Sequence, residues 1–454
     1  MDAAFISPET QGVGAADDGG AADHFDAVVL GAGISGLVAS SILLEQGCQT
    51  ILVVDQYDHV GGNHIDATIN GYTFDVGSLI FQDDSPLLRH FPEILEKYVP
   101  INPSWGRLNP QGVVTSYPIS LKADLLDAGP LELCRILSSL LWSRIFHRKL
   151  SNAREFAQYW LGARFLQRSG LGNYMERFYG SPPEKIDLKF AEKRMLGIKE
   201  QALVRTQFRR LLRGSRPVVR KNTQLARPQE GFAELYRPAV ERLQARGVTF
   251  VLGARTRSLR KDGGRFTLDA GARVFTTGRV VSTIPLDNIR QLCGLGREEK
   301  LATVTLITLF YSFAGDRGFQ QSVLYNFSFL GAWKRLTVYS DFYGRVSDRE
   351  YFAVEVNAQH VSGDAAVADA DFREHVEKNG LFQGDLRLEG SNALPHAYPI
   401  YIENAQENLA QTLAELRAFG IESIGRQGAF DYQPTARDTT LKAEAALSRK
   451  TEAR

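Results

Sequence analysis

The sequence predicts an α/β protein in which a Rossmann-like domain is assembled from discontinuous segments, with an inserted helical region and a second domain that contains a β-sheet. Two observations predict this fold. Residues 25–30 (FDAVVL) form a strand-like apolar run that leads into a glycine-rich turn, and a second such run, residues 51–54 (ILVV), ends at Asp55. The rest of the chain alternates between strand-like and helix-like patterns, and its 454 residues exceed one ordinary core.

The glycine-rich turn has the spacing of a dinucleotide-binding βαβ unit. Gly31 permits a tight turn, Gly33 lets backbone N–H groups approach a pyrophosphate at a helix N-terminus, and Gly36 lets the helix pack closely on the strand. Asp55 follows Gly36 by 19 positions (55 − 36), where an acid can bind a ribose hydroxyl. A lone motif also arises by chance, but here the strand, helix, second strand and acid follow in order. The predicted cofactor-binding residues of this unit are Gly31, Gly33, Ile34, Ser35, Gly36, Asp55 and Gln56.

A second glycine pair narrows the choice of cofactor. Gly61, Gly62 and Asn63 follow just after the predicted ribose-binding acid. This segment resembles that of the FAD enzymes related to amine oxidases and protoporphyrinogen oxidase, in which such a pair lies beside the flavin diphosphate and admits close backbone approach. The resemblance implies FAD as the cofactor, with NAD as the alternative, and it adds these three residues to the binding site.

Composition excludes some classes of function. The chain carries 53 basic and 52 acidic residues, a formal net charge of +1, so bulk electrostatics do not favour a nucleic-acid partner. Cys48, Cys134 and Cys293 are scattered without CxxC spacing, which favours a reducing compartment and argues against a metal site or a disulfide framework. The first 24 residues lack an export-signal pattern, and we expect a disordered leader and a cytoplasmic protein.

One apolar and basic stretch, residues 133–149, raises the question of a membrane. It is interrupted by arginines and is shorter than the roughly 20 apolar residues that span a bilayer. A helix lying on a membrane surface is one alternative. The favoured prediction is a helix packed on its own domain with a solvated basic edge.

The FAD-binding domain is expected to be discontinuous. Residues 304–311 and 336–339 alternate as strands and are placed in the sheet that floors the substrate cavity. Gly425 and Arg426 follow a late strand-like run, so that a turn and helix there would face the flavin. The predicted division is residues 1–24 for the leader, 25–84, 226–290 and 420–448 for the FAD-binding domain, 85–225 for a mainly helical insertion, and 291–419 for the sheet-containing substrate domain.

The chain also resembles a particular family, the bacterial UDP-galactopyranose mutases. The acid-containing segment and GGN run at residues 54–63 resemble the start of those enzymes, and further similar segments occur along most of residues 25–448. These are residues 178–186 (like WGxxPxEL), 333–337 (like YTRIT), 397–400 (like the YPI element) and 425–432 (like the GRxGxYxY turn at the flavin). The resemblance implies FAD, the flavoprotein fold and a sugar-ring isomerisation.

The resemblance also implies roles for individual residues. Arg335 aligns with a family arginine near the flavin and phosphates, although arginines at sheet edges are common. Arg426 would hold the flavin end of the site, Tyr398 of the YPI-like element would line an aromatic cavity, and Asp438 ends the altered element after the glycine turn. His64, directly after GGN, is a candidate proton shuttle, with a capping or core role as the alternative. The catalytic candidates are therefore Arg335, His64 and Tyr398.

Departures from the family pattern leave the reaction open. Residues 78–83 (SLIFQD) replace a run with two histidines, Tyr179 replaces a tryptophan, and Ile198 stands where a mobile-loop arginine is expected, with Arg205, Arg209, Arg210 and Arg213 nearby. One prediction is an FAD-dependent oxidoreductase acting on a small polar substrate, for example a sugar or nucleotide-sugar derivative. The other is a mutase-like pyranose/furanose isomerase with altered specificity, followed by a flavin-binding protein without turnover. No metal is expected, and a homodimer is left open.

Overall fold

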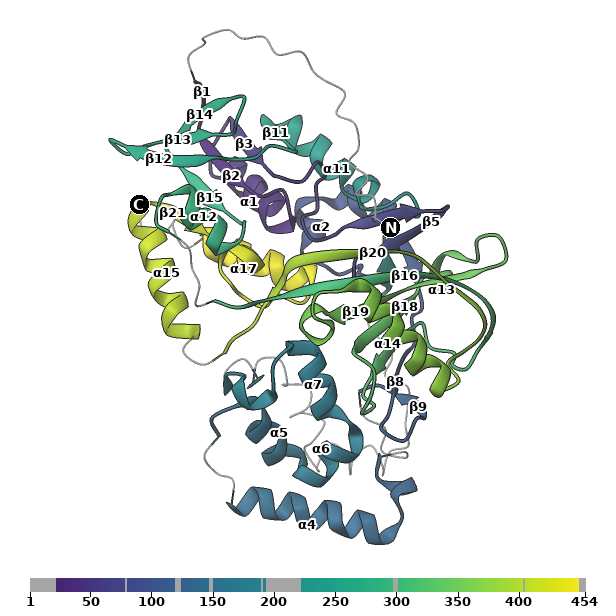
Figure 1. Ribbon diagram of the computed structural model, residues 1–454. Helices are drawn as coiled ribbons and strands as arrows, with labels where there is room; N and C mark the ends of the chain where they lie inside the picture. Colours follow the sequence, from purple (N-terminus) through teal and green to yellow (C-terminus); the bar gives the residue numbers. More distant parts are fainter. Residues whose placement is uncertain are drawn as a thin grey trace.

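The predicted α/β fold class is confirmed by the computed structural model, which describes residues 22–77, 80–118, 124–146, 150–188, 191–192, 222–296, 301–402 and 405–448. Figure 1 shows three regions. A parallel sheet with its helices occupies the top and left, a long and mainly antiparallel sheet lies to the right, and a group of helices, including α4 (Pro130–Phe146), forms the bottom.

The parallel sheet is the Rossmann-like core, and its five strands come from separated parts of the chain. The strand order is β11-β3-β2-β15-β21 and every pairing is parallel. The strands β2 and β3 are buried at every position, as their continuous apolar runs predict for a sheet covered on both faces. The bounds are β2 (Ala27–Leu30), β3 (Ile51–Val54), β11 (Val248–Val251), β15 (Val280–Ser282) and β21 (Ile421–Ser423).

Three helices cover the parallel sheet near the glycine-rich turn. The helix α1 (Ile34–Glu45) begins directly after β2 and packs against the C-terminal helix α17 (Ala436–Ser448). Ten of its residues are buried, as expected for a helix that carries apolar residues on all sides. The third helix, α11 (Phe232–Gln244), contacts α1 and β11. Helices from near the start and near the end of the described chain, α1 and α17, therefore pack together beside the glycine-rich turn.

A four-stranded sheet flanks the core and corrects one prediction. Its order is β1-β14-β13-β12, and β1 (Asp23–Phe25) pairs in parallel with β14 (Val274–Thr277). Residues 23 and 24 therefore belong to a strand and not to a disordered leader, because their backbone groups pair with β14. Residues 1–21 of the expected leader lie outside the described residues. The other two strands are β12 (Ser258–Asp262) and β13 (Arg265–Asp269).

The second large sheet has seven strands in the order β20-β16-β19-β18-β17-β8-β9. The long strands β16 (Thr303–Arg317) and β20 (Phe382–Pro399) pair over most of their length. Two short strands, β8 (Trp105–Leu108) and β9 (Val114–Ser116), come from the segment that was expected to be mainly helical, so that segment also builds sheet. The remaining strands are β17 (Val323–Asn326), β18 (Trp333–Val338) and β19 (Glu350–Asn357).

The group of helices at the bottom of Figure 1 comes from the same segment. The helix α4 packs on α5 (Ala153–Leu161) and α6 (Ala163–Ser169), and α7 (Leu171–Tyr179) contacts the seven-stranded sheet at β18 and β19. Among the described residues, no helix is long and apolar enough to cross a membrane. Residues 147–149 and 193–221, which include the expected arginine-rich loop, lie outside the described part.

The remaining helices and strands complete the described chain. The helical ones are α2 (Leu87–His90), η1 (Pro92–Lys97), η2 (Leu126–Ala128), η3 (Pro183–Lys185), α12 (Leu286–Leu292), α13 (Ser340–Tyr343), η4 (Ala358–Val361), α14 (Ala365–Lys378), α15 (Ala405–Phe419) and α16 (Gly425–Gly428). The strands are β4 (Asp66–Ile69), β5 (Tyr72–Asp75), β6 (Phe81–Gln82), β7 (Val99–Ile101) and β10 (Gln224–Ala226).

Candidate dinucleotide-binding site

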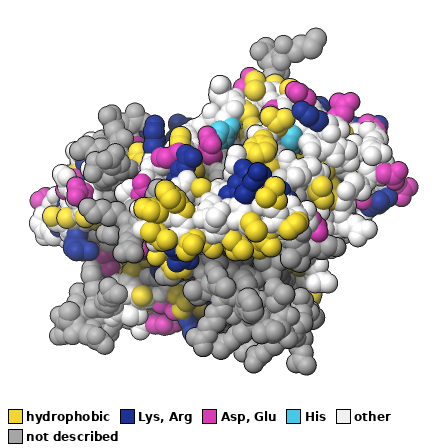
Figure 2. Space-filling view, turned by 90° about the horizontal axis from the view of Figure 1, so that it is seen from below, with side chains coloured by type: hydrophobic (Ala, Val, Ile, Leu, Met, Phe, Trp, Pro, Cys, Tyr) yellow, Lys and Arg dark blue, Asp and Glu magenta, His cyan; other side chains and the backbone are white. Residues whose placement is uncertain are grey.

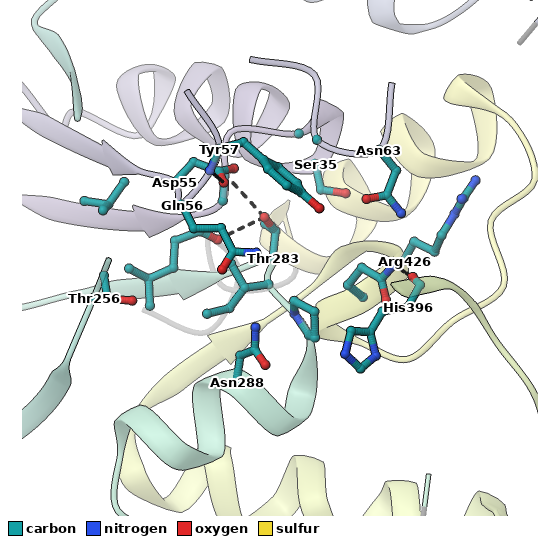
Figure 3. A pocket seen from close by; sticks show the side chains of 18 of the residues that line it. Ser35, Asp55, Gln56, Tyr57, Asn63, Thr256, Thr283, Asn288, His396 and Arg426 are labelled. Atoms are coloured by element: carbon teal, nitrogen blue, oxygen red, sulfur yellow. Dashed lines mark hydrogen bonds between the residues drawn. The ribbon is translucent and has the colours of Figure 1, made fainter. Parts of the chain in front are cut away.

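A cavity of about 630 Å³ lies at the carboxyl edge of the parallel sheet. Its walls come from the turns after β2, β3, β11 and β15, together with α12, the end of β20 and α16. Figure 3 shows Asp55, Gln56 and Thr256 at one end and Asn63, His396 and Arg426 at the other. Ligands of open α/β sheets bind at this edge, because the loops that follow the strands converge there.

Two glycines of the first motif are required by packing inside the protein. Gly31 has a φ of +104°, and a Cβ atom there would lie 2.3 Å from Thr283 Oγ1. A Cβ atom on Gly36 would lie 1.9 Å from the carbonyl oxygen of Gly31. Both positions therefore exclude a side chain, as the motif predicts, and Gly36 acts by close packing without lining the cavity.

Gly33 plays a different part, because it stands at the start of α1 beside the second glycine pair. Its φ is −72° and a Cβ atom there would meet only ordinary contacts, the nearest at 3.6 Å. Gly33 and Gly61 form an isolated parallel bridge, and the N–H of Gly61 donates to Ala32 O at 3.0 Å. As the N-cap residue, Gly33 offers no side chain to the first N–H groups of α1. An anionic ligand can therefore accept hydrogen bonds from these N–H groups in place of a capping side chain.

Asp55 lies at one end of the cavity and is 8% exposed. Its Oδ2 accepts from the N–H of Ala32 at 2.6 Å and its Oδ1 accepts from the N–H of Tyr57 at 2.9 Å. Burial raises the pKa of this carboxyl group, and the two backbone hydrogen bonds oppose that rise. The carboxylate is thus held in one orientation at the edge of the cavity, where its remaining lone pairs can accept from a hydroxyl.

Arg426 closes the other end. Its guanidinium donates to Gln433 O at 2.9 Å and to Ala397 O at 3.2 Å, so it ties α16 to β20. Gly425, with a φ of +83°, lies so close to Ser35 that a Cβ atom would come within 2.4 Å of Ser35 Oγ. The late turn therefore packs directly on the first motif, beside the cavity.

His64 lines the cavity, but its protonation state does not suit a proton shuttle. Its Nδ1 accepts from the hydroxyl of Tyr236 at 2.5 Å, and its ring packs against Phe81 and Phe232, each with centroids 5.4 Å apart. Burial, with a smaller contribution from the charge of Arg426, lowers the pKa of His64 to about 3. The ring is therefore neutral near pH 7, and its contacts support the alternative of a packing residue.

The other two catalytic candidates lie away from the cavity lining and belong to a shared network. Arg335 Nε donates to Glu355 Oε1 at 2.7 Å, and Lys334 Nζ lies 2.9 Å from Glu355 Oε2. Lys334 also donates to the hydroxyl of Tyr398 at 3.3 Å, and that hydroxyl donates to Phe178 O at 2.7 Å. Burial lowers the pKa of Lys334 and the charge of Glu355 opposes this.

The structure thus collects most, but not all, predicted site residues. The cavity is lined by Gly31, Gly33, Ile34, Ser35, Asp55, Gln56, Gly61, Gly62, Asn63, His64 and Arg426. Asp438 instead lies in the first turn of α17, where its N–H donates to Thr435 Oγ1 at 3.1 Å and its Oδ2 accepts from that hydroxyl at 2.6 Å, and the adjacent Thr439 reaches the cavity. Among the described residues, no group of three or more His, Cys, Asp or Glu side chains could hold a metal ion.

Several residues that line the cavity were not among those predicted from the sequence. Thr283 and Thr256 follow β15 and β11, so the rule that carboxyl ends of parallel strands share an edge could have found them. His396 lies in β20 with a φ of +52°, and no local pattern pointed to it. Asn288 comes from α12, whose place beside the cavity depends on tertiary packing.

The fold and the cavity are those of a protein with a Rossmann-like dinucleotide-binding domain. Residues 29–95 match the family model of an NAD(P)-binding Rossmann-like domain. Among curated proteins, prolycopene isomerase 2 of an Oncidium hybrid cultivar is 42% identical over 59 residues, which is 13% of this chain. The match spans only 10% of that relative's length.

Solved structures resemble almost the whole chain at low sequence identity. A reduced UDP-galactopyranose mutase has a TM-score of 0.77 at 17% identity and covers 95% of this chain and 94% of its own. A putative protoporphyrinogen oxidase from Exiguobacterium sp. 255-15 has a TM-score of 0.72 at 17% identity, with 96% and 100% covered. A putrescine oxidase reaches 0.60 at 13% identity, with 95% and 100% covered. These likenesses establish the shared fold.

Proposed function

We propose that the cavity binds FAD and that the protein is an FAD-dependent oxidoreductase acting on a small polar substrate. The observation that carries the cofactor assignment is the meeting of two glycine motifs. A Cβ atom on Gly62 would lie 3.0 Å from the Cα of Gly33, so bare backbone from both motifs forms one narrow cradle. A diphosphate fits such a cradle, because its oxygens can approach backbone N–H groups. An NAD site needs only the first motif.

The residues around the cradle would hold an extended dinucleotide in one direction. Asp55 would accept from the ribose hydroxyls at one end, and the start of α1 would face the diphosphate. Arg426 and Asn63 would lie toward the flavin end. When bound, the flavin supplies two-electron chemistry by accepting a hydride equivalent from a substrate carbon. The protein's part is to orient the flavin, exclude water and bind the substrate.

The surroundings of Arg335 favour oxidation over the mutase alternative. A sugar-nucleotide isomerase must hold a diphosphate with free cationic side chains. Here the guanidinium of Arg335 is neutralised by Glu355, and a cation–π contact places it 6.0 Å from the ring of Tyr325. Beside it, Tyr117 and Tyr325 stack with centroids 4.1 Å apart. In this aromatic region Glu355 is shared between Arg335 and Lys334, which leaves less cationic charge available to a diphosphate and favours a neutral or weakly polar substrate.

The experiment begins with the purified protein. Heat-released cofactor is compared with FAD, FMN and NAD by chromatography, and the oxidised protein is then mixed anaerobically with alcohols, amines and sugars. We expect released FAD and loss of the oxidised flavin absorption with at least one alcohol, amine or sugar. Released NAD in place of FAD would contradict the cofactor assignment.

A second arm separates the two reactions. Dithionite-reduced protein is mixed with UDP-, GDP- and dTDP-sugars, and the products are followed by mass and chromatography. An isomer of unchanged mass would establish the mutase alternative, because no electrons leave the substrate. The scattered cysteines support a reducing compartment, and we propose the cytoplasm as the location.

A further inference from the structure

The outer face of α4 is apolar and uncovered in the described structure. Six large apolar side chains of this one helix are at least 47% exposed. They are Leu131, Leu137, Leu141, Trp142, Ile145 and Phe146. Figure 2, which looks at the molecule from the side on which α4 lies in Figure 1, shows hydrophobic side chains running in a band across this face. Exposed apolar surface concentrated in this way marks an interaction site.

Helical geometry gathers these side chains on one side. Leu137, Leu141 and Ile145 are spaced by four residues and form one row, while Trp142 and Phe146 form the neighbouring row. The rings of Trp142 and Phe146 lie 4.1 Å apart. On the opposite side, Ile136 and Ser143 are buried against the protein. The helix is thus anchored by one side and presents the other outward, which differs from the expected solvated basic edge.

The charges around α4 are mainly basic. Its one carboxylate, Glu132, is paired with both Arg135 and Arg164, whose side chains are 60% and 45% exposed. Of the charged side chains on α4 and ion-paired with it, Arg135, Arg144 and Arg164 stand against Glu132, a formal charge of +2 (3 − 1). The whole chain has only +1, so positive charge is concentrated in this helical region.

We propose that α4 lies flat on an anionic lipid surface, with its apolar rows in the headgroup boundary and the exposed Arg135 and Arg164 at its edge near lipid phosphates. An apolar stripe flanked by basic residues fits such a surface, and a tryptophan in contact with a phenylalanine suits the boundary between headgroups and acyl chains. A second copy of the chain fits less well, because a symmetric contact through α4 would bring two faces of the same positive sign together.

The test uses the full-length protein and vesicle co-sedimentation. Vesicles of phosphatidylcholine with roughly 30% phosphatidylglycerol are compared with pure phosphatidylcholine vesicles. We expect binding to the anionic vesicles, at least about tenfold weaker binding to the neutral ones, and loss of binding in about 1 M salt. Equal binding to both vesicles, or binding to neither, would overturn the proposal.

Matched variants locate the contact. Leu141→Ser/Trp142→Ser should weaken binding about tenfold or more, because both side chains would enter the boundary region. The control is Leu95→Ser/Val274→Ser, which removes exposed apolar side chains from η1 and β14 in the dinucleotide-binding part. Circular dichroism confirms that both variants are folded. Equal loss of binding in both variants would overturn the assignment to α4.

A fluorescent label on α4 tests membrane contact independently. Cys134 is exposed on α4, whereas burial raises the thiol pKa of both Cys48 and Cys293, so an environment-sensitive thiol reagent should label Cys134 first. Its emission should shift to the blue on adding anionic vesicles. Three results together would establish self-association instead. The protein would form a concentration-dependent dimer in sedimentation, the emission would shift to the blue without lipid, and the Leu141→Ser/Trp142→Ser variant would show neither effect.

Discussion

At the scale of single residues, the glycines of the site divide into two kinds. Gly31 and Gly36 are glycines because the protein itself leaves no room for a side chain. Gly33 has room for a methyl group as far as the protein is concerned, and its conformation is open to other residues. Its lack of a side chain therefore points to a ligand that approaches the backbone there.

This difference gives the first prediction. Gly36→Ala should destabilise the protein by about 3 kcal/mol or prevent folding, because the new methyl group would overlap the carbonyl oxygen of Gly31. Gly33→Ala should fold with a loss of about 1 kcal/mol or less and yet fail to retain the flavin. Urea denaturation and the flavin content after gel filtration measure the two effects. A yellow Gly33→Ala protein with full cofactor would contradict the cradle.

His64 gives a prediction about pH. Its folded-state pKa of about 3 lies below the ordinary value of 6.5, so the unfolded chain takes up a proton first as the pH falls. Stability from the neutral ring is therefore present above pH 6.5 and is lost as the pH falls toward 3. Because the His64 ring also lines the cavity, we expect the free energy of unfolding to fall by only about 1 kcal/mol between pH 7 and pH 5.

The measurement compares urea denaturation of the wild type, His64→Gln and the exposed-residue control His24→Gln at the two pH values. The His64→Gln protein should lose about 1 kcal/mol less than the wild type over this range, because it lacks the titrating ring. The control should behave as the wild type does. Identical pH dependence in all three proteins would exclude His64 as the source.

At the scale of elements, β18 and β19 carry a buried network of one carboxylate and two cations. Glu355 of β19 pairs with both Lys334 and Arg335 of β18, and the side chains of Glu355 and Lys334 are each only 4% exposed. The two strands are adjacent in the sheet, so the network reinforces their pairing. Glu355 keeps a lowered pKa because, although burial raises it, the two cations lower it more.

Removing the shared carboxylate should be costly. Glu355→Gln should lower the free energy of unfolding by about 3 kcal/mol, because two buried cations lose their counter-charge. The exposed pair Arg237–Glu241 provides the control, and Glu241→Gln should change stability by less than about 0.5 kcal/mol. Adding Lys334→Met to Glu355→Gln should recover part of the loss. A neutral effect of Glu355→Gln in denaturant titration would show that the network does not stabilise the sheet.

The elements also show how far the sequence determines the outcome. The run from Gly31 to Asp55 could be predicted because its strand, turn and helix are local and because Gly31 and Gly36 have nearby steric causes. Tyr398 and Arg335 were assigned by resemblance, and the structure places them in a network whose other members, Lys334 and Glu355, had no sequence signal. Their pairing depends on the register of β18 and β19, which a single sequence does not specify.

At the scale of the whole molecule, the cavity joins parts of the chain that are far apart. Its walls include Gly31, Thr256, Thr283, His396 and Thr439. A ligand that contacts all of these regions holds them together, so binding should couple to global unfolding and not to one loop.

Cofactor binding should therefore raise overall stability. Adding FAD to the cofactor-free protein at about 100 times its dissociation constant should add about 2.7 kcal/mol to the free energy of unfolding. Asp55→Asn should reduce this gain at equal FAD concentration, because an anionic acceptor for the ribose hydroxyls is lost, while the exposed neighbour variant Asp58→Asn should keep it. Thermal denaturation with and without FAD measures the gain. Equal gains in both variants would remove Asp55 from the binding site.

The strand order of the parallel sheet has a consequence for synthesis of the protein. β15 lies between β2 and β21, and β21 ends at residue 423. The ribosome must therefore release nearly the whole chain before this sheet is complete, and the early strands leave the tunnel long before their neighbours exist. The early strands therefore keep unpaired edges until β21 is made, and a chain terminated before residue 421 lacks this edge strand of the sheet that carries the candidate dinucleotide site.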